Sequence, residues 1–219
     1  MTFQRRFLGR LVLAVSAAAA LASPFAAHAA DEAPDVLIRR LSDEVLGSIK
    51  ADSALRSGDN SKVMALVDTK VMPNLNFQRM TASAVGPAWR QATPQQRERL
   101  QQEFKTLLIR TYSGALTQVS DQQVTVKPLR AAADAKEVLV RTEVTGRGDP
   151  VQLDYRLERT PGDGAGWKIY NLNVLGVWLV ETYRSQFAQE INSKGIDGLI
   201  ETLAARNQSN SNNAAARRG

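Results

Sequence analysis

The stretch Trp167–Phe187 reads WKIYNLNVLGVWLVETYRSQF, and the rest of the chain is organised around it. It begins as a strand in which apolar and polar residues alternate imperfectly, so that both faces carry apolar side chains. This pattern is typical of a strand that is buried on both sides or bulged near Asn171–Asn173. After Gly176 the apolar period changes from two to nearly four, which predicts an amphipathic helix directly after the strand. The apolar face of that helix consists of Val180, Tyr183, Phe187 and Ile191.

Residues 1–29 have the features of a signal peptide. Arg5, Arg6 and Arg10 form a basic start, and the apolar run 11–21 is too short to span a bilayer. Residues 27–29 read AHA, which is an A-x-A cleavage site, so we expect an exported, soluble mature protein. The Arg5-Arg6 pair leaves the twin-arginine export route open. The ordinary secretory route is favoured, because no polar residue separates the pair from the apolar residues that follow.

The composition of the mature chain excludes several kinds of site. Without the signal peptide, 25 basic residues stand against 22 acidic ones, and this weak excess does not indicate a nucleic-acid partner. The chain has no Cys, and its one His is His28, inside the signal peptide. A Ser-His-Asp or Cys-His site, a zinc site of the His/Cys type and a disulfide are therefore excluded. A single domain over residues 31–206 is long enough to fold around its own core.

Helical spacing of apolar residues predicts helices over 31–52, 61–72, 76–85, 93–119, 177–194 and 197–206. The start of the longest helix is the clearest. Thr93 is a candidate N-cap, Pro94 occupies the first helical position, and Gln96 completes a capping box. Residues 207–219 have no apolar period, so we expect a disordered tail there.

Period-two alternation predicts four strands, at residues 124–127, 137–145, 151–158 and 167–174. Short turns join them, so neighbouring strands should be antiparallel. The predicted fold class is α+β, with a twisted four-stranded antiparallel sheet whose one face packs against a layer of helices.

Few residues invite a chemical role. Asp154 and Tyr155 adjoin in a strand, and a carboxylate and a phenol can act as acid and base. The alternation favours another arrangement, in which Asp154 pairs with Arg156 on the solvent face while Tyr155 packs inside. Arg184, beside Tyr183, can hold an anion, although such an arginine more often caps carbonyls or pairs with an acid.

Six aromatic residues can either line a cavity or fill an ordinary core: Trp89, Tyr112, Tyr155, Trp167, Tyr170 and Trp178. The sequence contains no glycine-rich phosphate loop and no acidic metal cluster. Catalysis therefore has no positive support, and we expect no catalytic residue, no metal and no cofactor.

A resemblance adds to this reading. Residues 88–97 read AWRQATPQQR, and they are followed by EFKTLL at 103–108 and YSGAL at 112–116. Further along, Val151–Leu157 is followed by GWKIY at 166–170, Gly176-Val177, YRSQF at 183–187 and KGIDGL at 194–199. In this order the pieces resemble the MlaC family, also called the toluene-tolerance auxiliary proteins. The resemblance covers about residues 60 to 205.

The resemblance implies a periplasmic phospholipid carrier that maintains the lipid asymmetry of the outer membrane, and not an enzyme. The implied partners are a diacyl phospholipid, an inner-membrane ABC transporter with MCE domains, and an outer-membrane lipoprotein–porin complex. The carrier would be a monomer without nucleic acid. Its cargo would lie in an apolar pocket between the sheet and the helices, and docking of a partner would open the helical layer.

We expect ten residues to line that pocket, although each of them can instead be ordinary core. They are Trp89, Leu107, Leu108 and Tyr112 from the helices, and Val140, Leu153, Tyr155, Ile169, Val174 and Val177 from the sheet. The family usually has an aspartate at the position of Asn171, an acidic residue at Leu175 and a serine at Trp178. These departures lie beside the strand-to-helix junction, where Trp178 can narrow or reshape the pocket mouth.

Two other functions compete with the carrier. One is an enzyme of the ketosteroid-isomerase-like cone type acting on a small apolar substrate, which requires Asp154 or another acid to point inward. The other is a lipid-free envelope adaptor, which predicts a filled core without a cavity.

Overall fold

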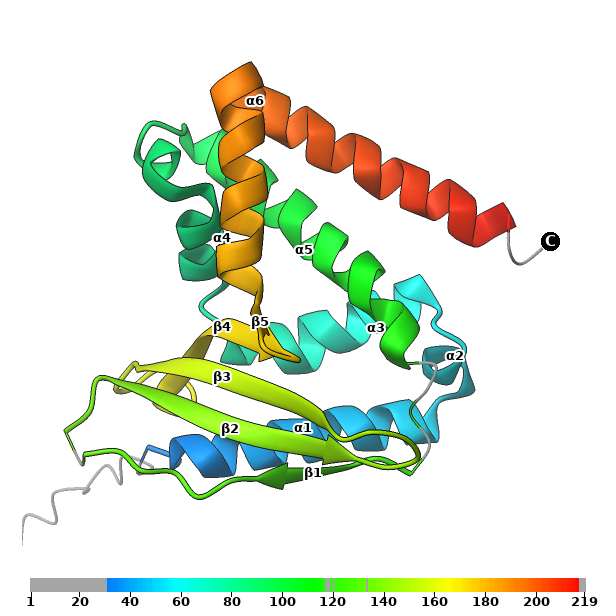
Figure 1. Cartoon of the computed structure of the whole chain (residues 1–219), viewed down its shortest axis with the longest axis vertical. Coiled ribbons are helices and arrows are strands. Elements are labelled where there is room, and N and C mark those ends of the chain that lie inside the picture. The colour runs from blue at the N-terminus through cyan, green and yellow to red at the C-terminus, as the bar shows by residue number, and fades with distance from the viewer. Residues whose placement is uncertain (1–30, 117–118, 120, 133, 217–219) are drawn as a thin grey trace, which may run out of the picture.

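The computed structural model describes residues 31–116, 119, 121–132 and 134–216, so the expected signal peptide lies outside the described residues. The described chain combines helices with one antiparallel sheet, which confirms the α+β class (Figure 1). None of the described helices is long and apolar enough to cross a lipid bilayer.

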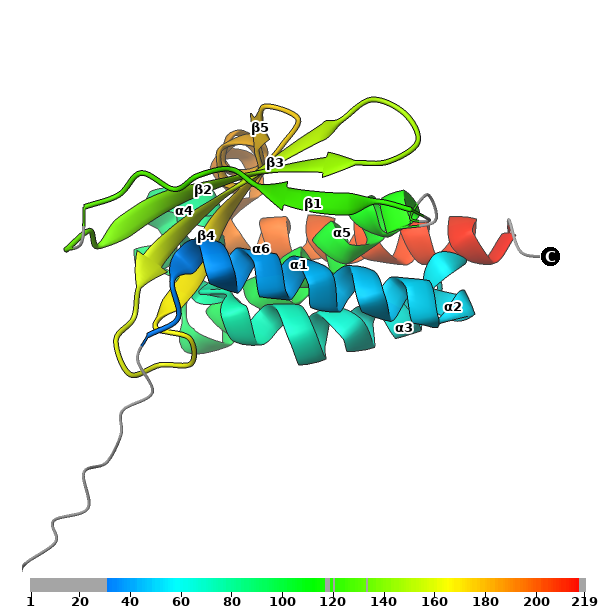
Figure 2. The same cartoon turned by 90° about the horizontal axis from the view of Figure 1, so that it is seen from below.

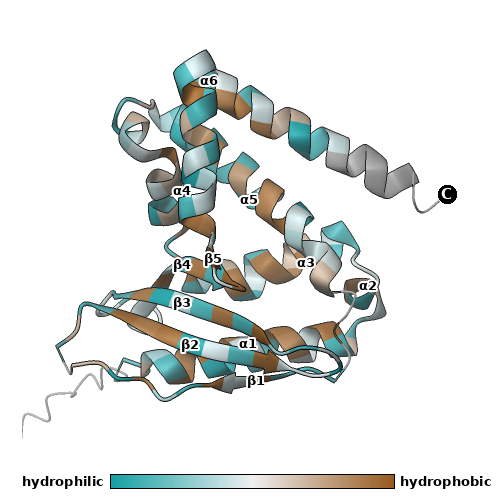
Figure 3. Ribbon diagram, viewed as in Figure 1, coloured by the Kyte–Doolittle hydropathy of each residue, from teal (hydrophilic) through white to brown (hydrophobic). Residues whose placement is uncertain are grey.

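The sheet is a meander of five strands in the order β1-β2-β3-β4-β5, and polar and apolar residues mix along β2 and β3 (Figure 3). The strands are β1 Gln123–Val126, β2 Glu137–Thr145, β3 Val151–Arg159, β4 Trp167–Val174 and β5 Val177–Trp178. The predicted count of four is therefore wrong, because β5 is too short to produce a visible apolar period. Leu175 and Gly176, with φ of +52° and +85°, form the tight turn that folds β5 back onto β4.

The predicted helices at residues 31–52, 61–72 and 76–85 are confirmed in position. The one at 93–119 is confirmed as far as Leu116, and residues 117–118 lie outside the described residues. The α-helices are α1 Pro34–Ala51, α2 Ser53–Arg56, α3 Asn60–Leu66, α4 Phe77–Val85, α5 Pro94–Leu116 and α6 Leu179–Ala216. After α3 the chain stays helical but changes type, through the π turn η1 (Val67–Val71) and the 3-10 turn η2 (Met72–Asn74). A further 3-10 turn, η3 (Gly86–Arg90), connects α4 to α5.

The start of α5 carries the predicted capping box. The Thr93 N–H donates to Gln96 Oε1 at 2.9 Å, and the Gln96 N–H donates to Thr93 Oγ1 at 3.2 Å. Pro94 follows at the first helical position, where a missing N–H costs no intrahelical hydrogen bond.

Helix α1 lies across one face of the sheet, which we call the inner face (Figure 2). Its Leu37 and Ile38 pack against Val140, Leu157 and Ile169 in one buried cluster. Both Leu37 and Leu157 are 0% exposed, so this cluster fixes α1 to the sheet.

Helices α4, α5 and α6 form a second body, the helical unit, with a core of its own. The Phe104 ring lies at its centre, with centroid distances of 5.8 Å to Phe77, 4.9 Å to Tyr183 and 5.2 Å to Phe187. Such aromatic pairs add about 0.5–1.5 kcal/mol each to the burial of their area. Tyr183 and Phe187 do share one buried helical face, as the sequence predicted.

The helical unit rises from the β4–β5 edge of the sheet (Figure 1). The Asn76 N–H donates to the Ile169 carbonyl at 2.8 Å, and Leu75 forms a bridge with Ile169, so the chain before α4 continues the sheet edge. Helix α6 follows β5 directly at the same edge. The prediction of one helical layer on one face is thus corrected, because these two short connections hold α4 and α6 at the edge while α1 covers the face.

Helix α6 bends at Gly195, whose φ of +71° and ψ of −171° are not helical, so the two predicted helices meet there. The second segment continues to Ala216, where we predicted a disordered tail from Asn207 onward. Asn207 is buried, and its Nδ2 donates to the carbonyl oxygen of Glu103 at 3.0 Å and to its Oε2 at 2.7 Å. This contact with α5 is polar, and an apolar period cannot reveal it.

Candidate functional site

The inner face of the sheet divides into two halves that differ in cover. In the covered half, Leu157 and its cross-strand partner Ile169 are buried under α1. In the other half, which we call the open half, Leu153, Leu172 and Val174 are only partly buried. Leu153 pairs with Val174, and Leu172 pairs with Tyr155, so these side chains share the inner face.

A bulge in β4 creates this arrangement. Arg156 pairs with Asn171 but Leu157 pairs with Ile169, which leaves Tyr170 without a cross-strand partner. The extra residue lets Ile169 and Leu172 face the same side although they are three positions apart. The imperfect alternation in the sequence therefore has a physical cause, and the bulge lies next to the predicted Asn171–Asn173 segment.

Tyr155 marks the boundary between the two halves. It is partly exposed by surface area, and it packs against the cluster under α1. Burial raises the pKa of its phenol to about 12, although hydrogen bonds with Thr142 and with Ser42 of α1 oppose the shift. Tyr155 is therefore a neutral side chain at any physiological pH.

The helical unit faces the open half. Leu172 and Val174 pack against the same cluster that contains Leu107 of α5, and Leu108 is a partly buried neighbour of that cluster. One turn further along α5, the Tyr112 side chain is 38% exposed. The open half and α5 together form an apolar seam that is less tightly covered than the rest of the core.

The ten residues expected to line a pocket are distributed over several places. Trp89, Leu107, Leu108 and Val174 belong to the core of the helical unit, whereas Val140, Tyr155 and Ile169 belong to the cluster under α1. Leu153 is partly buried, and Tyr112 and Val177 are exposed. Their role as lipid-lining residues stays a prediction. Among them, Val174 of the open half packs in the same cluster as Leu107 and Leu108 of α5.

The β4–β5 hairpin closes one end of the open half. Val177 pairs with Val174 and so lies on the inner face, where it is 50% exposed. Trp178 pairs with Asn173 and lies on the opposite, outer face. Trp178 is therefore not at the inner-face seam, contrary to our expectation of a narrowed mouth there. Leu175 at the hairpin tip is 64% exposed.

The candidate acid and base lie on opposite faces of β3. Asp154 is on the outer face, where it is buried and accepts a hydrogen bond from Gln152 Nε2 at 2.7 Å. The expected Asp154–Arg156 pair on a solvent face is wrong, because Arg156 instead pairs with Glu181 at 2.7 Å and stacks 3.9 Å from the Trp178 ring centroid. Since Asp154 does not point to the inner face, the geometry does not favour the cone-type enzyme.

Two groups of ion pairs hold the helical unit to the outer face of the sheet. In the first, Arg79 of α4 contacts Glu158 at 2.5 Å and Glu137 at 2.7 Å, and its guanidinium lies 3.6 Å from the Tyr170 ring centroid. Burial disfavours the charged guanidinium, but the hydrogen bonds to Glu137 and Glu158 outweigh it and raise the pKa of Arg79. The same bond from Arg79, with one from Tyr170, lowers the pKa of Glu137.

The second group joins the start of α6 to the sheet. Glu181 accepts from Arg156 at 2.7 Å and from Asn171 Nδ2 at 2.7 Å. Burial acts to raise the pKa of Glu181, but these two hydrogen bonds outweigh it and lower the pKa. The Asn171 Oδ1 also accepts from the N–H groups of Leu172 and Val180, so this asparagine connects β4 to the first turn of α6.

We call Arg79–Glu137/Glu158 and Glu181–Arg156 the sheet–helix ion pairs. Sequence reasoning missed both groups, because the partners are between 25 and 79 residues apart in the chain. The available signal was only that β3 alternates charged with apolar residues and that α4 carries one arginine, and such a signal does not identify a partner.

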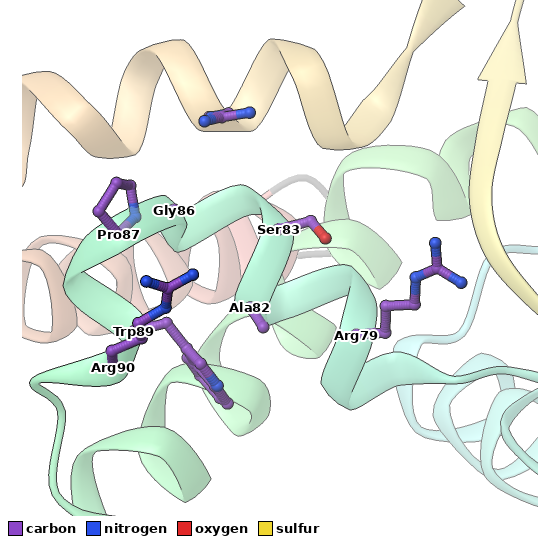
Figure 4. Close-up of a pocket in the computed structure, with 8 residues that line it drawn as sticks. Arg79, Ala82, Ser83, Gly86, Pro87, Trp89 and Arg90 are labelled. Atoms are coloured by element: carbon purple, nitrogen blue, oxygen red, sulfur yellow. The ribbon is translucent and has the colours of Figure 1, made fainter.

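Two cavities of the described chain lie away from the seam. One, of about 410 Å³, lies between α4, η3 and α6, and Trp89 is among its lining residues (Figure 4). The other, of about 350 Å³, lies between α1 and β1, near Asp43, Lys50 and Gln123. The predicted apolar pocket between sheet and helices is not one of these two. Among the described residues, no three acidic side chains come together as a metal site.

Comparison with known proteins places this geometry in a family. The family model described as "MlaC protein" matches residues 39–205. The toluene tolerance protein Ttg2D of Pseudomonas putida is 29% identical over 170 residues, which are 77% of this chain and 77% of that protein. The intermembrane phospholipid transport system binding protein MlaC of Haemophilus influenzae is 23% identical over 176 residues, which are 80% of this chain and 82% of that protein.

A solved structure agrees with these relatives. It is the phospholipid-binding protein from Ralstonia solanacearum, in complex with a phospholipid, and its sequence is 47% identical to this chain. The superposition has a TM-score of 0.77 and covers 81% of this chain and 98% of that one. The matched region includes most of the described sheet and helices. By the extent of the family match, this chain belongs to the MlaC family.

Proposed function

We propose that this protein is a periplasmic phospholipid carrier that moves lipid between the outer and inner membranes and so maintains outer-membrane lipid asymmetry. The observation that carries the proposal is the Ralstonia solanacearum structure, which contains a phospholipid on the same fold at 47% identity. The open half of the inner face supports it from this chain alone. We assign no catalytic role to any residue, and the phospholipid is cargo rather than a cofactor.

The acyl chains would lie in the seam between the open half and α5. Two acyl chains hold on the order of thirty methylenes, and burial contributes about 0.8 kcal/mol for each. The apolar term therefore dominates, and the carrier needs an apolar slot more than a specific headgroup site. The partly exposed Leu108 and Tyr112 on one side, with Leu153 and Val174 on the other, would contact the chains.

Release requires the seam to widen. The helical unit is attached to the sheet at the β4–β5 edge and by the sheet–helix ion pairs, and Ile109 of α5 packs against α3. Widening the seam would therefore loosen these contacts while the two larger cores stay folded. We infer that the inner-membrane MCE-domain transporter and the outer-membrane lipoprotein–porin complex each shift this equilibrium toward an open form when they dock. The carrier acts as a monomer that an N-terminal signal peptide at 1–29 directs to the periplasm.

Mass spectrometry of solvent extracts tests the proposal directly. The mature protein, purified after export to the periplasm, should carry diacyl phospholipid in a near-stoichiometric amount. A folded, monodisperse protein without lipid, which also fails to extract phospholipid from vesicles, would overturn the carrier and favour a lipid-free adaptor.

A further inference from the structure

The cavity between α4, η3 and α6 is a groove with three arginines and no acidic residue in its lining (Figure 4). Its lining residues are Arg79, Ala82, Ser83, Gly86, Pro87, Trp89, Arg90 and Arg184. The volume of about 410 Å³ is enough for several side chains of a partner. The groove lies on the helical unit and is separate from the inner-face seam.

The positive charge of the groove comes from Arg90 and Arg184. Arg79 at one end is already engaged by Glu137 and Glu158. Arg90 and Arg184 are both exposed, and across residues 31–116, 121–132 and 134–216 neither forms an ion pair with a carboxylate. Within the described part of the chain, Arg184 thus neither caps a carbonyl nor pairs with an acid, which were the ordinary roles expected for it.

The walls of the groove are held in place by the local structure. Gly86 has a φ of +73°, a backbone conformation that favours glycine. A Cβ at this position would be in ordinary contact with Arg184 Nε, at 3.7 Å, so α6 passes close to the start of η3. Arg97 donates to the carbonyls of Trp89 and Arg90, each at 3.1 Å, and its guanidinium lies 5.5 Å from the Trp89 ring centroid. The groove is therefore formed before any partner arrives.

We propose that this groove is a docking site for an acidic segment of a partner protein. Guanidinium groups match the geometry of carboxylates, which they bind through two parallel hydrogen bonds. Arginine and tryptophan are also the residues most enriched at the energetic centre of protein interfaces. A membrane surface fits less well, because the cations line a concave groove beside Trp89 and Pro87 rather than a flat face.

This inference rests on the proposed carrier role, since a carrier must dock at two membranes. The test uses the full mature protein, ¹⁵N-labelled, and an octaglutamate peptide at low salt. The three tryptophans give three indole N–H signals, of which only Trp89 lies in the groove. Trp167, buried under α1, is the internal reference. We expect a saturable shift of the Trp89 signal alone, which is lost at high salt.

Charge reversal locates the site. The double substitution Arg90→Glu and Arg184→Glu should weaken peptide binding at least tenfold, whereas Arg39→Glu, at an exposed arginine of α1, should leave it unchanged. If the reversed protein does not fold by circular dichroism, Arg90→Gln with Arg184→Gln replaces it. Unchanged binding in the groove variant, or equal loss in the Arg39 variant, overturns the proposal.

Two further probes separate the sources of negative charge. If inorganic phosphate moves the Trp89 signal with the same affinity as the peptide, the groove is a small-anion site and the proposal fails. If phosphatidylglycerol vesicles bind through Arg90 and Arg184 while the peptide does not, a membrane surface is the occupant and the proposal also fails. Lipid content, measured by mass spectrometry on each variant, reports the carrier role separately, because the groove residues lie apart from the seam in which cargo is proposed to bind.

Discussion

The two halves of the inner face have similar apolar side chains but different surroundings. In the covered half, Leu157 and Ile169 are buried by α1, whose Leu37, Ile38 and Leu41 pack against the sheet. In the open half, Leu153, Leu172 and Val174 are only partly buried. Leu172 and Val174 contact the helical unit, which is held at the sheet edge, by the sheet–helix ion pairs and by Ile109 of α5 against α3. Apolar residues that nothing covers fully are free to bury a ligand, so cover rather than composition separates the folding core from the proposed binding surface.

The largest effect should come from the covered half. Leu157→Ala removes a side chain that is 0% exposed, so we expect the free energy of unfolding to fall by about 2–5 kcal/mol. Urea denaturation of lipid-free protein measures it. Phospholipid carried by the folded fraction should stay near the wild-type amount. If Leu157→Ala lowers the amount of lipid per folded molecule as much as Val174→Asp does, the two halves do not differ in function.

A substitution in the open half should lower lipid retention, whereas one in the covered half should lower stability. Val174→Asp places a carboxylate against the expected acyl chains, and burying an unpaired charge there is unfavourable. We expect phospholipid retention to fall at least tenfold, or about 1.4 kcal/mol, at pH 7. Leu139→Asp on the outer face is the matched control, because Leu139 is 36% exposed and lies on the other side of the sheet. Equal retention in both variants would show that the seam does not hold the lipid.

The sheet–helix ion pairs should have a smaller, pH-dependent effect. The pKa values of Glu137 and Glu181 lie below their ordinary value of 4.5 in the folded protein. Their contribution to stability is therefore complete above that ordinary value and is lost as the pH falls through the lower folded values. Both side chains are about half exposed, so solvent screening limits the total to about 1 kcal/mol.

Thermal melts of wild type and of Glu137→Gln/Glu181→Gln at several pH values measure this term. The wild type should be more stable at pH 6, and the difference should shrink as the pH falls below 4.5 and disappear once both carboxyl groups are protonated in the folded protein. The variant should also release phospholipid faster to vesicles at pH 6, since the helical unit is held less firmly. A stability difference that persists at low pH would assign the effect to packing rather than charge.

The smallest effect on stability should come from a substitution at the start of α5, away from both halves of the inner face. Thr93→Ala removes the side-chain acceptor of the capping box, and because the site is exposed we expect a loss of about 0.5 kcal/mol. Chemical denaturation detects this change, and lipid retention should not alter. If phospholipid retention falls with this substitution, a loss of stability alone reduces retention. The loss measured for Val174→Asp would then have to be compared with variants of equal stability.

Local pattern was enough for most elements of this chain. The capping box, the strand-to-helix stretch Trp167–Phe187 and the helix break at Gly195 depend on neighbouring residues, and the sequence carries that information directly. The family resemblance was likewise carried by short segments in order, and the match to residues 39–205 confirms it.

Contacts between distant segments were decided only by the tertiary structure. The bulge at Tyr170 sets which apolar residues face α1, and the position of α1 then decides which half stays open. Arg90 and Arg184 are 94 positions apart, and only the passage of α6 over Gly86 brings them to one groove. Periodicity describes the faces of single elements, whereas cover and charge pairing depend on where the elements cross, and sequence spacing does not encode that geometry.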